Sequence, residues 1–96
     1  MKIDIDQNET TLTVALGGRL TTTSSTDLLE ALHLDGITNL IMDFEKLEYI
    51  SSAGLRILIM LQKKMQTQGS MKLIHVNEMV REVLDMTQLS GYLTIE

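Results

Sequence analysis

The feature that most constrains the fold is a regular alternation of strand-like and helix-like segments along the chain. Residues 2–6 and 10–16 alternate apolar with polar side chains, which predicts two half-exposed strands, and the short polar stretch between them favours an antiparallel hairpin. Beyond residue 20, a helix-like segment separates each strand-like segment from the next. Strands joined through a helix run parallel, so the predicted order ββαβαβαβ implies an α/β fold: a mixed sheet of about five strands with helices packed against it.

The first half of the chain contains one predicted helix and one predicted central strand. Gly17-Gly18 interrupts the second strand, and helix one is expected from about Ser25 to Leu34, with Ser24 as its N-cap. The nearly continuous apolar run at residues 39–44 is typical of a central strand covered on both faces. Residues 45–50 are expected to form a loop.

The second half repeats the strand and helix pattern. Helix two is expected to open at residues 51–54 and to end with Gly69 as its C′ residue. A strand at residues 71–76 and a third helix capped by Asn77 follow. Residues 93–95 predict a last short strand after a glycine.

Length and charge restrict the function. The 96 residues suffice for one domain over residues 1–96, with a single hydrophobic core. The formal charge is −5, and the 8 basic residues are scattered, so a nucleic-acid partner is not expected, because phosphate binding needs a clustered basic face. No apolar run approaches the roughly 20 residues of a membrane span, and the charged N-terminal segment is unlike a signal peptide. The sequence therefore predicts a cytoplasmic protein without membrane insertion.

Neither a metal site nor a cofactor is predicted. The chain has no cysteine, and its histidines, His33 and His75, lie on different elements without carboxylates at a spacing typical of a ligand set. A serine hydrolase would need a Gly-x-Ser-x-Gly elbow and an oriented base, and neither is recognisable. We therefore expect a protein-interaction domain and not an enzyme.

Residues 51–55, Ser-Ser-Ala-Gly-Leu, form the junction between a strand and the second helix. Their small side chains leave the helix N-terminus open, where unpaired N–H groups and the helix dipole favour negative charge. A phosphate on a serine here would leave the fold intact, while its charge of roughly −1.5 to −2 changes the surface offered to a partner. The alternative is that Ser51 or Ser52 only caps the helix, since serine is a common N-cap.

Three segments resemble the STAS domain of bacterial anti-sigma factor antagonists. They are residues 18–23 (GRLTTT), 40–44 (LIMDF) and 47–58 (LEYISSAGLRIL), and the resemblance extends over essentially the whole chain. It implies a single STAS-like domain that, when unphosphorylated, binds an anti-sigma factor serine kinase, so that the sigma factor is released and activates transcription. It further implies that this kinase phosphorylates and thereby releases the antagonist, and that a PP2C-type phosphatase resets the switch.

The resemblance also suggests site residues. Matched on Gly54-Leu55, the family's phosphorylated serine falls on Ser52, with Ser51 as the alternative acceptor. The expected partner-binding residues are Thr21, Thr22, Ser51, Ser52, Ala53, Gly54 and Arg56. The family often has aspartate where this chain has Thr21 and Ser51, and this difference bears on kinase recognition.

Two alternative functions stay open from the sequence. A constitutive STAS scaffold, such as a subunit of a larger sensory or transport assembly, would bind regardless of phosphorylation, and the two hydroxyls in place of aspartates favour it. A nucleotide-binding or small-ligand-binding domain would use the N-terminus of helix two as an anion site.

Overall fold

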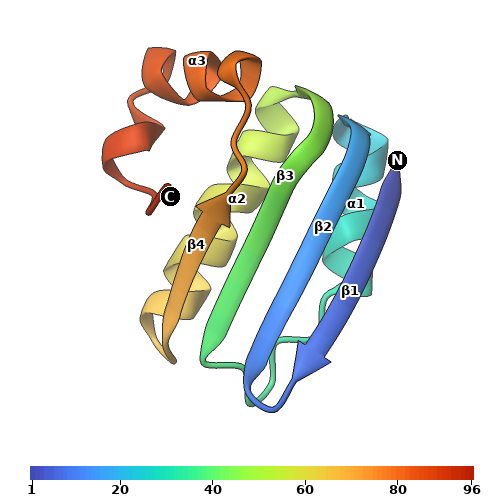
Figure 1. Ribbon diagram of the computed structural model, residues 1–96, viewed down its shortest axis with the longest axis vertical. Coiled ribbons are helices and arrows are strands. Elements are labelled where there is room, and N and C mark those ends of the chain that lie inside the picture. The colour runs from blue at the N-terminus through green and yellow to red at the C-terminus, as the bar shows by residue number, and fades with distance from the viewer.

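A mixed sheet of four strands forms the framework of the computed structural model, which describes residues 1–96 (Figure 1). The elements are β1 (Lys2–Asn8), β2 (Thr11–Leu20), α1 (Thr22–Ala31), β3 (Asn39–Ile50), α2 (Ser52–Gln66), β4 (Ser70–Ile74), α3 (Glu78–Met86) and a 3₁₀ turn, η1 (Leu89–Gly91). Strands β1 and β2 form the predicted antiparallel hairpin, and β2, β3 and β4 run parallel in the spatial order β1-β2-β3-β4. The predicted α/β class and mixed sheet are confirmed.

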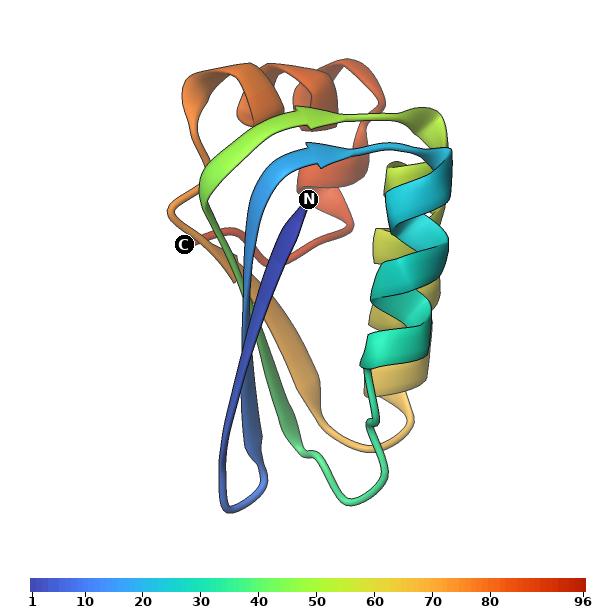
Figure 2. The ribbon, with the colours of Figure 1, turned by 90° about the vertical axis from the view of Figure 1, so that its right-hand side faces the viewer.

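The helices are divided between one face and one end of the sheet. Helices α1 and α2 cover one face, and α3 lies over the end of β3 (Figure 2). Between the sheet and the helices, 20 buried apolar side chains form one core, with Phe44 and Leu58 fully buried. The longest helix, α2, has 15 residues, and none of the helices combines the length and apolarity of a membrane span.

Strands β2 and β3 are longer than predicted. β2 continues through Gly17-Gly18 to Leu20, and residues 45–50, expected as a loop, form the second half of β3. The register of the two strands shifts at the glycines, and Gly18 has a φ of +93°, which other residues rarely adopt. The glycines therefore let the strand bend toward the helices instead of ending it (Figure 2).

Coverage of the sheet also differs from the expectation. Leu40 and Met42 of β3 are buried, but Ile41 between them is only half-buried, so helices cover one face of this strand and not both. The predicted fifth strand is reduced to a single parallel bridge between Ile95 and Leu73 of β4. The turn η1 precedes this bridge, so only the last few residues of the chain reach the edge of β4.

Three helix boundaries differ from the prediction, both ends of α1 and the end of α2, whereas the predicted cap of α3 is confirmed. α1 begins at Thr22 and not at Ser25, because Thr21 and not Ser24 is its N-cap, and it ends at Ala31. α2 ends at Gln66, so Gly69 is not its C′ residue; a Cβ at Gly69 would collide with the Thr38 carbonyl, and this close approach requires glycine. Asn77 caps α3 as predicted.

Candidate functional site

The ends of β2 and β3 place the N-termini of α1 and α2 next to each other. Leu20 and Ile50, the last residues of these strands, are partners in the parallel register, and the Ser51 amide donates to the Leu20 carbonyl at 2.8 Å. A single N-cap residue then separates each strand from its helix, Thr21 for α1 and Ser51 for α2. Both N-termini therefore lie at the same edge of the sheet (Figure 2).

The neighbouring serines of α2 have different roles. Ser51 is half-buried, and its hydroxyl accepts a hydrogen bond from the Gly54 amide at 3.1 Å. Ser52 is the first residue of the helix; it is exposed, and its hydroxyl makes no hydrogen bond within the protein. The capping interpretation therefore applies to Ser51, and Ser52 presents a free hydroxyl at the surface.

Thr21 and Thr22 repeat this arrangement at α1. The Thr21 hydroxyl accepts from the Ser24 amide at 3.4 Å, and the Ser24 hydroxyl accepts from the Thr21 amide at 2.7 Å, which together form a capping box. Thr22 is exposed at the first helical position, as Ser52 is in α2. Thr22 and Ser52 thus occupy equivalent places on the two helices.

Gly54 supports the site from the inside. It is buried, and a Cβ at this position would lie 2.8 Å from Ile50 Cγ1 and 2.9 Å from Leu20 Cδ2. The glycine therefore allows α2 to begin directly against the ends of both strands. Ala53 beside it is half-buried, so of these two residues Ala53 is the one with surface for a partner.

The electrostatic environment of this edge favours an anion. Neither helix has an acidic residue in its first turn, and the amides of Ser52 and Ala53, like those of Thr22 and Thr23, have no backbone acceptor. Arg56 is exposed, takes part in none of the ion pairs and lies four residues after Ser52, which places both side chains on one face of α2.

A cation–π pair that the sequence analysis did not single out lies next to the two helix N-termini. The Arg19 guanidinium carbon is 4.4 Å from the centre of the Tyr49 ring, and both side chains are exposed. The two residues are partners in the β2 and β3 register, one position before the strands end. Only the parallel register brings them together, so no local sequence signal could have identified the pair.

The predicted site residues offer binding groups. None of them is a histidine, a cysteine or a carboxylate, so they hold no metal-ligand set, and no base contacts the Ser52 hydroxyl. What this edge can supply is an accessible hydroxyl that can accept a phosphoryl group, together with amides and a guanidinium that can contact an anionic or polar partner.

Comparisons with known proteins agree with the resemblance seen in the sequence. The STAS domain family model matches residues 2–96. BtrV of Bordetella bronchiseptica, whose name assigns it as an anti-sigma factor antagonist, is 33% identical over 99 residues, covering 99% of this chain and 83% of BtrV.

Two solved structures of the anti-sigma factor antagonist SpoIIAA have a similar fold. The unphosphorylated form matches with a TM-score of 0.85 and 17% identity, covering 99% of this chain and 88% of SpoIIAA. The phosphorylated form, from Bacillus, matches with a TM-score of 0.71 and 17% identity, covering 99% of this chain and 91% of that one.

Proposed function

The chain belongs to the STAS domain family of anti-sigma factor antagonists, and we propose that it acts there as a phosphorylation-switched binding module. In its unphosphorylated form it binds an anti-sigma factor that is also a serine kinase, so that the sigma factor is released and activates transcription. Phosphorylation of Ser52 by this kinase ends the complex, and a PP2C-type phosphatase restores the hydroxyl. The protein acts in the cytoplasm, by binding and not by catalysis.

The observation that carries this proposal is the difference between Ser51 and Ser52. Phosphorylation of Ser51 would disturb the cap bond from the Gly54 amide, whereas the Ser52 hydroxyl is exposed and has no bond to lose. A switch residue must change the surface without unfolding its host, and Ser52 meets this requirement.

The surroundings of Ser52 would tolerate a phosphate. Its charge of roughly −1.5 to −2 would lie at the positive end of the α2 dipole, with no acidic residue in the first turn of either helix to repel it. Arg56, on the same face of α2, can reach toward it. SpoIIAA, whose fold this chain shares, has been solved in both an unphosphorylated and a phosphorylated form, which supports a phosphorylation that leaves the fold intact.

The proposed partner surface consists of the exposed and half-buried residues at this edge. Its residues are Thr21, Thr22, Ser51, Ser52, Ala53 and Arg56, with Gly54 as buried support. A partner that packs closely over the Ser52 hydroxyl would have to accommodate a bulky dianion after phosphorylation, and desolvating that charge weakens the complex.

The proposal is tested by incubating the protein with a candidate kinase and Mg-ATP, followed by peptide mass spectrometry and calorimetry of the complex before and after the reaction. We expect phosphate on Ser52 and loss of binding. Ser52→Ala should bind the kinase as the native protein does and should stay bound when ATP is added.

Ser51→Ala is the matched control, because it changes the neighbouring hydroxyl and should still be phosphorylated at Ser52. Two outcomes would contradict the assignment of Ser52. One is phosphate on Ser51 or Thr22 of the native protein instead of on Ser52. The other is a Ser52→Ala protein that leaves the kinase on addition of ATP as readily as the native protein does.

A constitutive STAS scaffold is the second candidate function. Thr21 and Ser51, the positions where the family often has aspartate, are occupied by hydroxyls that cap α1 and α2. If kinase recognition needs those acids, the protein would not be phosphorylated, and its binding to a partner would not be regulated by phosphorylation. A stable complex in Mg-ATP without any phosphopeptide would favour this function.

A further inference from the structure

A histidine and two carboxylates meet where β3 lies beside the end of β4. The His75 Nδ1 atom is 3.0 Å from Asp43 Oδ1 and 3.7 Å from Glu45 Oε2, and one donor atom from each residue lies within 4.8 Å of the other two. Asp43 is the register partner of Ile74, the last residue of β4, so His75 follows directly beside it. The proposed partner switch does not use any of these three residues.

We propose that Asp43, Glu45 and His75 form a binding site for a divalent transition-metal ion of the Zn²⁺ type. One imidazole nitrogen with two carboxylate oxygens is a mixed ligand set that suits Zn²⁺, whereas Mg²⁺ and Ca²⁺ prefer oxygen ligands alone. Two carboxylates also supply the negative charge that a dication requires. This site departs from the sequence-based expectation that neither histidine belongs to a ligand set.

The spacing of the donor atoms fits a tetrahedral ion. For metal–ligand distances of about 2.0–2.2 Å, two ligand atoms at corners of a tetrahedron are about 3.3–3.6 Å apart. The separations of 3.0 Å and 3.7 Å from His75 Nδ1 lie on either side of this range, so shifts of a fraction of an ångström suffice. The Glu45 and His75 side chains are 67% and 56% exposed and are free to make them.

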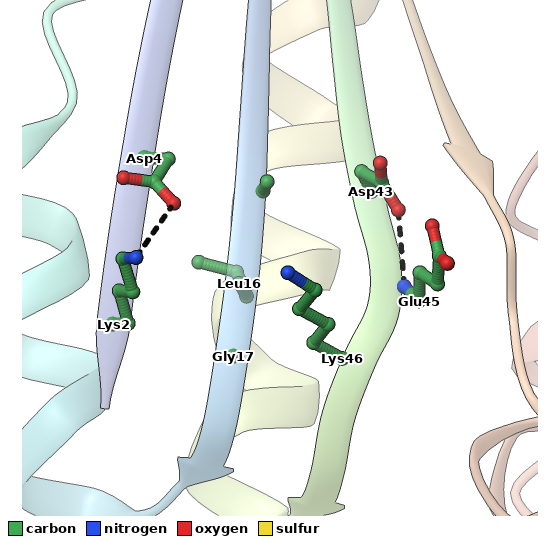
Figure 3. A pocket seen from close by; sticks show the side chains of 8 residues that line it. Lys2, Asp4, Leu16, Gly17, Asp43, Glu45 and Lys46 are labelled. Atoms are coloured by element: carbon green, nitrogen blue, oxygen red, sulfur yellow. Dashed lines mark hydrogen bonds and ion pairs between the residues drawn. The ribbon is translucent and has the colours of Figure 1, made fainter.

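The position of Asp43 is more restricted. Its side chain is only 22% exposed, and its Oδ1 atom accepts a hydrogen bond from the Glu45 amide at 3.0 Å. This bond, drawn in Figure 3, orients the carboxylate, and an orienting contact of this kind is common for metal ligands. Asp43 is therefore the fixed ligand, and the two exposed side chains close on the ion from the solvent side.

A fourth coordination position would face solvent. Asp43 and Glu45 also line a pocket of about 190 Å³ on the face of the sheet that α1 and α2 leave uncovered (Figure 3). Lys46 lines the same pocket, but in Figure 3 its side chain extends toward β2 and away from Glu45. Three protein ligands with one accessible position resemble an open site and not a closed structural one.

The test is calorimetric titration of the full chain with ZnCl₂ and, separately, with MgCl₂. We expect one Zn²⁺ per chain and no comparable binding of Mg²⁺. His75→Asn should weaken Zn²⁺ binding at least about tenfold, because loss of even an outer contact to a ligand costs about 10–100-fold. Asparagine suits this position because His75 has a φ of +54°, which asparagine tolerates better than most residues.

His33→Asn changes the only other histidine and is the matched control, expected to bind Zn²⁺ as the native chain does. Glu45→Gln alters an exposed ligand without touching the backbone, and it decides the question if His75→Asn fails to fold by far-ultraviolet circular dichroism. Absence of Zn²⁺ binding to the native chain, or native affinity in Glu45→Gln, would overturn the proposal.

Discussion

The N-termini of α1 and α2 follow the same plan and differ most at one position. Each helix begins one residue after a parallel strand, with an extended hydroxyl N-cap and an exposed hydroxyl at the first helical position. At the third helical position, α1 has Ser24 and α2 has Gly54. The Ser24 hydroxyl accepts from the Thr21 amide at 2.7 Å and donates to the Arg19 carbonyl at 2.8 Å. Gly54 provides no such bonds and packs closely against the two strand ends.

This difference shows two ways to stabilise a helix start. α1 is held by side-chain hydrogen bonds that join its first turn to the end of β2, whereas α2 has one cap bond, from the Gly54 amide to the Ser51 hydroxyl, and the close packing of Gly54 against the strand ends. Thr22 and Ser52, the first residues of the two helices, are nevertheless both exposed, and neither hydroxyl makes a hydrogen bond within the protein. The two helix starts are thus stabilised differently, although both leave a hydroxyl free at the first helical position.

The largest effect is expected from Gly54→Ser, which would give α2 the third-position residue of α1. Its Cβ would come within 2.8 Å of Ile50 and 2.9 Å of Leu20, and we expect this overpacking to lower the free energy of unfolding by about 1–3 kcal/mol in urea denaturation. Gly91→Ser is the control, because a Cβ there meets nothing within 4 Å and should change stability by less than about 0.5 kcal/mol. Equal losses in the two variants would contradict the packing explanation.

An intermediate effect is expected when the two caps are compared. Ser24→Ala removes bonds to both Thr21 and Arg19 and should cost about 2 kcal/mol, whereas Ser51→Ala removes one cap bond and should cost about 1 kcal/mol. Urea denaturation of both variants shows which one loses more of the free energy of unfolding. Thr23→Ala, which changes an exposed residue in the same first turn as Ser24, is the control. A greater loss in Ser51→Ala would mean that α2, and not α1, depends on its polar cap.

The smallest effect is expected from a negative charge at the two equivalent first positions. Ser52→Asp and Thr22→Asp should each raise the free energy of unfolding by about 0.3–1 kcal/mol at low salt, because both carboxylates lie at a helix N-terminus, and the gain should shrink as salt is added. Ser52→Asn and Thr22→Asn are the uncharged controls. If Ser52→Asp destabilised the protein and Thr22→Asp did not, α2 would tolerate negative charge less well than α1, and this result would count against a phosphate at Ser52.

Parts of the fold and site were predictable because they depend on near neighbours in the sequence. The hairpin of β1 and β2 follows from alternating side chains around a short polar turn, and Asn77 was identified as the α3 cap from the apolar pattern that follows it. The segment around Ser52 was recognised from residues 47–58, whose strand, junction and helix are consecutive in the chain.

Other features were missed because they depend on residues far apart in the sequence. Residues 45–50 contain charged side chains and suggested a loop, but they pair with the end of β2 and so continue β3. The early start of α1 was missed for a local reason instead: the Ser24 hydroxyl bonds to the Thr21 amide and to the Arg19 carbonyl, three and five residues back, so that Thr21 and not Ser24 is the cap. The Arg19 and Tyr49 pair depends on the same register.

By itself, the sequence determined the order of the first seven elements, from β1 to α3, and the position of the two serines at the start of α2, since hydrophobic periodicity and capping are local properties of the chain. Only the tertiary structure decided that Gly54 must be glycine, that two helix N-termini share one edge, and that His75 meets Asp43, 32 residues away in the sequence. The physical reason is that side-chain periodicity specifies which face of a strand is buried, whereas pairing between strands decides which residues become neighbours.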